Sequence, residues 1–156
     1  MKEEGLATRP VTKWRSALEI DFDIFSVGIE NRRAHVMVAK FWGKYLPPGG
    51  RREGGGFMAM VVAAALAWER GPGIGLVVDM SDLEYSGGDR LFLWKYKVAN
   101  VGLKGPAYKV ALVQSPKNHD RIQSLLEEEE DQHLMKASFD TLDDAINYVI
   151  SETSAP

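Results

Sequence analysis

A dense group of polar side chains follows a short apolar run near the middle of the sequence. Its members are Asp79, Ser81, Asp82, Glu84, Ser86 and Asp89. The apolar run 74–80 predicts a strand buried on both faces, and ligands of open α/β sheets bind beyond the carboxyl ends of such strands. A predicted helix follows, and its first N–H groups can hold an anion. We therefore expect a ligand or partner site in this turn, at Asp79, Ser81, Asp82, Ser86, Gly87, Gly88 and Asp89.

The same turn also has a plainer, structural interpretation. Ser86 or Asp89 would cap the following helix, and the carboxylates would be solvated. A calcium loop needs oxygen ligands at fixed positions, and the spacing here does not match an EF-hand. We therefore expect no metal site and no cofactor.

Other residue types that carry chemistry form no convincing catalytic set. The three histidines, His35, His119 and His133, have no partner at zinc-ligand spacing. The sequence has no Gly-x-Ser-x-Gly elbow. It has no cysteine, which excludes disulfides, thiolate zinc sites and a cysteine nucleophile. We predict that the protein is not an enzyme.

A glycine-rich loop at 43–56 carries Arg51 and Arg52. It lacks the Gly-Lys-Ser/Thr ending of a P-loop, so a flexible connection is the simpler interpretation, with the two arginines as a candidate anion loop. The run 127–131 is acidic, which is typical of a solvated helix face, although a basic partner could recognise it. Self-association is expected through apolar and aromatic side chains of two predicted helices: Phe57, Met60, Trp68, Phe92 and Tyr96.

Composition restricts the class of protein. The 156 residues are 45% hydrophobic and 26% charged, which predicts one domain with a sizeable core. We place it at 14–152, after a flexible tail at 1–13. The net charge of −3 argues against general nucleic-acid binding. No apolar run reaches the about 20 residues that span a bilayer. With no signal peptide evident, we expect a cytoplasmic protein.

Hydrophobic periodicity predicts an α/β fold with a mixed sheet in the order β-β-α-β-α-β-α-β-α. A change of phase near Ile24 and Phe25 suggests a bulge or a short break in the first strand. Thr141 with Asp144 resembles a capping box that opens the last helix. The expected elements are strands 14–29, 34–42, 74–80, 108–113 and 135–139, and helices 57–70, 89–101, one starting at 115 or 118, and 141–151, with a turn at 81–88.

Three segments resemble the STAS domain, the fold of bacterial anti-sigma-factor antagonists and their SpoIIAA-like relatives. Segment 75–83 (GLVVDMSDL) resembles the family's central strand with its Asp, 109–113 (KVALV) the next strand, and 139–146 (FDTLDDAI) the closing segment. The resemblance covers about residues 20–151. It implies a phosphorylatable serine followed by glycine, and Ser86-Gly87 falls near that place. This sequence departs from the pattern because Tyr85 stands where the family has an Asp.

Two functions follow from these observations. The first is a non-catalytic, STAS-like bacterial regulatory module that binds a protein partner or itself, with a homodimer expected. The alternative is a protein that binds a nucleotide, a lipid or another anion or amphiphile in a pocket at the turn 81–89.

Overall fold

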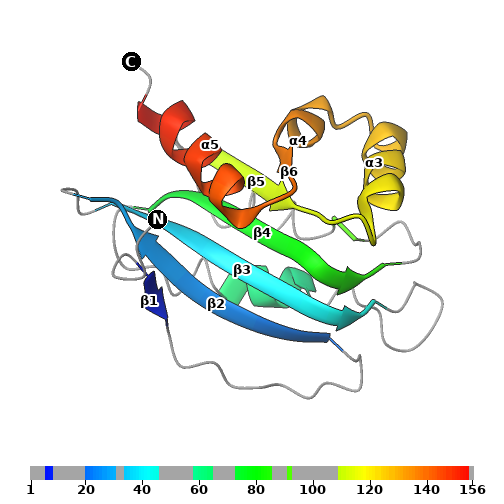
Figure 1. Ribbon diagram of the computed structural model, residues 1–156, viewed down its shortest axis with the longest axis horizontal. Helices are drawn as coiled ribbons and strands as arrows, with labels where there is room; N and C mark the ends of the chain where they lie inside the picture. Colours follow the sequence, from blue (N-terminus) through cyan, green and yellow to red (C-terminus); the bar gives the residue numbers. More distant parts are fainter. Residues whose placement is uncertain are drawn as a thin grey trace.

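The computed structural model describes residues 6–8, 20–30, 34–45, 58–64, 73–85, 91–92 and 109–154. It is a mixed α/β structure whose strands form one sheet in the order β1-β2-β3-β4-β5-β6 (Figure 1). The strands are β1 (Leu6–Thr8), β2 (Ile20–Gly28), β3 (His35–Lys44), β4 (Gly73–Glu84), β5 (Lys109–Val113) and β6 (Ser138–Phe139). The labelled helices are α3 (His119–Glu128), α4 (Gln132–Lys136) and α5 (Leu142–Ser154), and residues 58–64 are also helical.

Strands β1, β2 and β3 pair antiparallel, whereas β3, β4, β5 and β6 run parallel. The predicted mixed α/β architecture is therefore confirmed. Strand β1 was not predicted, because its three residues lie in the segment expected to be a tail. None of the helices in the described part of the chain has the length and hydrophobicity needed to cross a lipid bilayer.

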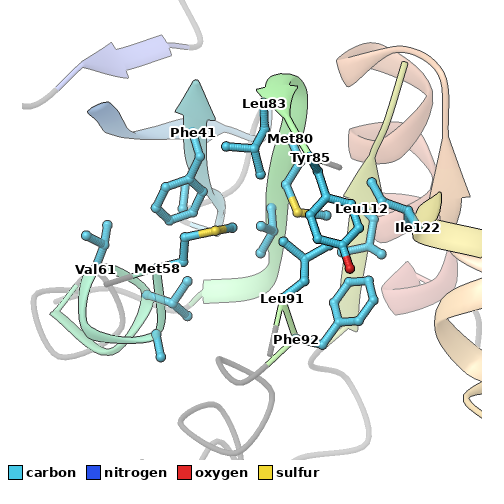
Figure 2. Close-up of a cluster of buried hydrophobic side chains, with 14 of the residues drawn as sticks. Phe41, Met58, Val61, Met80, Leu83, Tyr85, Leu91, Phe92, Leu112 and Ile122 are labelled. Carbon is cyan, nitrogen blue, oxygen red and sulfur yellow. The ribbon is translucent and has the colours of Figure 1, made fainter. Parts of the chain in front are cut away.

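Two hydrophobic clusters cover opposite faces of the sheet. The first joins alternate residues of β2, β3 and β4, such as Ile24, Phe41 and Met80, to helix 58–64, α3 and α4 (Figure 2). The second packs α5 against Val38 and Val77. Apolar residues of parallel strands must be covered on both faces, and these helices provide the two layers.

The predicted bulge or short break in β2 is wrong. Residues 20–28 pair with β3 without a register shift. Instead, Ile20, Phe22 and Ile24 belong to the first cluster, whereas Phe25 and Val27 belong to the second. The phase change therefore marks the point where the second face of an unbroken strand becomes apolar.

Two other predicted elements need correction. The turn predicted at 81–88 begins later, because β4 continues to Glu84 and pairs there with Lys44 of β3. The strand predicted at 135–139 is reduced to Ser138–Phe139. Helix α4 occupies the preceding residues because the Asp131 side chain caps it, accepting a hydrogen bond from the Leu134 N–H at 3.0 Å.

Helix α5 confirms the predicted cap. The Thr141 hydroxyl accepts a hydrogen bond from the Asp144 N–H at 3.1 Å, and the buried residues Ala145, Ile146 and Val149 face the sheet. Only Leu91 and Phe92 of the predicted helix 89–101 are described, in a turn.

Candidate functional site

The sheet face that α5 covers is apolar over only half of its length. Phe25, Val38 and Val77 stand side by side across β2, β3 and β4, and they pack in the cluster beneath α5. The next row towards the carboxyl ends of β3 and β4 is Asp23–Lys40–Asp79, and the one after it is Asp21–Trp42–Asp82. We call these six residues the polar half-face. In Figure 1, α5 lies over β4 and β5 and leaves the arrowhead ends of β3 and β4 uncovered by any labelled helix.

A bulge in β4 sets the direction of the acidic side chains. The register against β3 shifts between Lys40 and Trp42, so that Lys40 pairs with Asp79 but Trp42 pairs with Asp82. The Asp79 carboxylate stabilises the extra residue, accepting hydrogen bonds from the Ser81 N–H at 2.9 Å and the Ser81 hydroxyl at 2.7 Å. Because side chains alternate between faces, the bulge turns Leu83 into the core and keeps Asp82 beside Trp42.

Asn118 supports β4 where its neighbouring strand ends. Strand β5 pairs with β4 only as far as Val113, opposite Asp79. Beyond that point the Asn118 side-chain amide donates hydrogen bonds to the carbonyl oxygens of Met80 and Leu83, both at 2.8 Å. Its own carbonyl oxygen accepts from the Ser115 N–H at 3.0 Å. Asn118 is 1% exposed, so these bonds satisfy groups that water does not reach.

A second polar chain joins β5 to α3. The side-chain amides of Gln114 and Gln123 are 2.9 Å apart, with Gln123 donating, and the Gln114 amide nitrogen lies 2.7 Å from His119 Nδ1. Gln114 is buried, whereas the His119 side chain is exposed. These contacts fix the start of α3 against the sheet, so His119 has a structural partner that spacing in the sequence did not reveal.

The polar half-face carries negative charge. Lys40 forms an ion pair with Asp82, with 3.3 Å between Nζ and the carboxylate oxygen, and the two side chains are 33% and 56% exposed. Four aspartates and one lysine leave a formal charge of −3 on this surface. Trp42 lies among them, half-buried and outside the two hydrophobic clusters that the described residues form.

The structure brings part of the predicted turn together. Asp79, Ser81 and Asp82 lie at the end of β4, with Asp79 3% exposed and committed to the bulge. The remaining predicted residues of the turn and of the anion loop lie outside the described part of the chain: Ser86, Gly87, Gly88, Asp89, Arg51 and Arg52. Sequence reasoning missed Trp42, Lys40, Asp21, Asp23 and Asn118.

The predicted self-association surface is only partly described. Met60 is 60% exposed, as an interface residue should be. Phe92 is 1% exposed and packs in the first cluster (Figure 2), so including it in the self-association surface is wrong. Phe57, Trp68 and Tyr96 lie outside the described residues. No group of three or more metal-ligating side chains occurs among the residues that the structure describes.

A concavity of about 650 Å³ lies at α3 and α4, away from the polar half-face. It is lined by Glu127, Glu130, Gln132, Met135 and Lys136. The acidic run that the sequence predicts to be solvated is exposed here at 127–130.

Comparison with solved structures identifies the fold. The chain is similar to a protein described as an anti-sigma factor antagonist from Mycobacterium paratuberculosis, at 17% sequence identity and a TM-score of 0.53. The alignment covers 86% of this chain and 97% of that one. No protein-family model and no curated protein matches the sequence. The predicted STAS-like fold is confirmed, in a strongly divergent sequence.

Proposed function

We propose that this protein is a non-catalytic, STAS-like regulatory module that acts by binding a protein partner. One observation carries the proposal: over 86% of its length the chain has the fold of an anti-sigma factor antagonist, a type of protein named for acting on another protein.

The local chemistry supports binding. The Asp79 carboxylate accepts both Ser81 hydrogen bonds and orders the bulge, and the Asn118 amide holds the carbonyls of β4. These polar groups therefore build a rigid strand end. A rigid sheet surface is preorganised for a macromolecular partner, because little conformational freedom is lost when the complex forms.

The small-ligand alternative stays a prediction. It requires a pocket at 81–89, but Ser81 and Asp82 are strand residues whose nearby polar contacts are internal to the chain. The described concavity at α3 and α4 is lined by other residues.

The test is to capture partner proteins from cell extract and then to reconstitute the complex from purified components. The full chain, carrying an affinity tag, is incubated with extract of its source cells, and each enriched protein is purified and titrated against the untagged chain. We expect a complex of defined stoichiometry by light scattering. If purified candidates do not bind, and a nucleotide or lipid instead raises the melting temperature, the proposal is wrong and the ligand alternative is favoured.

A further inference from the structure

We propose that the polar half-face is the docking surface for a segment of a partner protein that carries arginine or lysine side chains. The inference rests on the proposed function, and it adds the location of the surface and the chemistry of the partner. Three features of the described residues support it: charge, a partly exposed indole and a rigid frame.

The charge pattern selects a cationic partner. Asp23 and Asp79 flank Lys40, and Asp21 and Asp82 flank Trp42, on adjacent strands. Lys40 is paired with Asp82 at 3.3 Å and is the one cation among the six residues. Asp79 is buried, so the accessible side chains Asp21, Asp23, Asp82 and Lys40 carry a formal charge of −2. A partner with complementary charge is attracted to such a surface, whereas acidic surfaces are repelled.

Trp42 gives the surface more than charge. An indole normally buries its area in a core, yet this one is partly exposed and belongs to neither hydrophobic cluster of the described residues. It lies between the positions of two carboxylates in one row across three strands. A guanidinium placed over the ring would gain a cation–π contact and could form an ion pair with a neighbouring carboxylate. Tryptophan and arginine are also the residue types that dominate binding energy at interfaces.

The frame holds this arrangement in place. All six residues lie on strands, and the β4 bulge keeps Asp82 on the same face as Trp42. Helix α5 packs on the apolar rows further along the same face, and none of the labelled helices covers the arrowhead ends of β3 and β4 (Figure 1). Asp82 is exposed and Asp21, Asp23, Lys40 and Trp42 are partly exposed, whereas Asp79 is buried and holds the bulge.

The acidic run at 127–130 is the competing surface. Its concavity contains a cation of its own, Lys136, and its other lining residues are Glu127, Glu130, Gln132 and Met135, with no aromatic ring among them. The polar half-face therefore fits an arginine-bearing segment better, and the helical run serves as the matched control.

The test uses the ¹⁵N-labelled full chain and, as the probe, a synthetic peptide of alternating arginine and glycine. Amide and indole NMR signals are followed during titration at low and at physiological salt. We expect shifts centred on residues 21–23, 40–42 and 79–82, with the Trp42 indole signal assigned by a Trp42→Phe variant.

Two double variants remove equal charge from the two surfaces. Asp21→Asn with Asp82→Asn should weaken peptide binding about tenfold, because two ion pairs between peptide arginines and these carboxylates are lost. Glu127→Gln with Glu128→Gln should change it by less than about twofold. Trp42→Ala should weaken it about threefold at an exposed cation–π site. Dispersed amide spectra verify that each variant is folded.

Shifts centred on 127–130, loss of binding in the Glu127→Gln, Glu128→Gln variant alone, or no binding at low salt would overturn the inference. Testing a captured partner with the same variants distinguishes failure of this docking surface from failure of the proposed function. Equal capture by both double variants contradicts this docking surface but not the proposed function. Peptide binding at the polar half-face without any captured partner supports the surface and contradicts the proposed function.

Discussion

Gly75 leaves no room for a side chain between β4 and α5, and replacing it tests how α5 packs on the apolar half of this face. A Cβ at Gly75 would overlap Val149 Cγ1 of α5 and would lie 2.6 Å from the backbone oxygen of Lys109 on β5. A rotation of Val149 would relieve the first contact. The second involves a backbone atom of a paired strand, since Gly75 and Lys109 are register partners, so the ladder itself must shift.

The expected cost follows from the two contacts. Overpacking a rigid core costs about 1–3 kcal/mol, and the backbone contact places Gly75→Ala towards the upper end. Alanine also restricts the unfolded chain, which offsets about 0.4–1 kcal/mol. We therefore expect the free energy of unfolding to fall by about 2 kcal/mol, and the melting temperature to fall by about 4–8 °C for a chain of this size.

The assay is urea unfolding followed by circular dichroism, with Gly28→Ala as the matched control. Gly28 is exposed at the end of β2, so its replacement should change the free energy of unfolding by less than about 1 kcal/mol. The double variant Gly75→Ala, Val149→Ala should be less destabilised than the sum of the single changes, because truncating Val149 removes one of the two contacts. The reasoning is refuted if Gly75→Ala is as stable as wild type or if the two changes are additive.

Two further predictions concern the end of β4, and a third concerns the start of α5. Asn118→Ala removes the donor to the carbonyls of Met80 and Leu83, so we expect the free energy of unfolding in urea to fall by about 2–4 kcal/mol. Replacement of the exposed Asn147 by alanine is the control. Equal stability of the two variants would contradict the role of Asn118 in supporting β4. Asp79→Ala should increase amide hydrogen exchange at 79–84 more than Asp79→Asn, because the asparagine side-chain oxygen still accepts hydrogen bonds from Ser81. Equal exchange in the two variants would show that these hydrogen bonds do not stabilise the bulge. Thr141→Ala should lower the free energy of unfolding by about 1 kcal/mol, because it removes the cap of α5. Thr141→Ser keeps the hydroxyl and should retain most of that stability; if it is as unstable as Thr141→Ala, the hydroxyl is not the stabilising group.

The sequence predicted the elements whose stabilising residues lie close together along the chain. The cap at Thr141 could be read from the residue type and its spacing to Asp144, because both partners lie in one helical turn. Apolar runs identified β4 and β5 for a similar reason, since a strand covered on both faces needs apolar residues at successive positions.

Long-range contacts explain what the sequence did not predict. Asn118 reaches Met80 and Leu83 from more than thirty positions away, and nothing in its neighbourhood signals that contact. The β4 bulge does have a local signal, because the buried residues Met80 and Leu83 are three apart where an unbroken strand requires an even spacing. The polar half-face required the register of three strands, since its members come from segments that look unrelated along the chain.

The central claim is that this STAS-like module binds its partner through the polar half-face. Hydrogen exchange of the full chain, alone and in complex with its captured partner, tests it most directly. The account predicts protection on binding at 20–24, 39–44 and 79–84, with little change at 119–136. Protection confined to 119–136, with the strand ends unchanged, would contradict it.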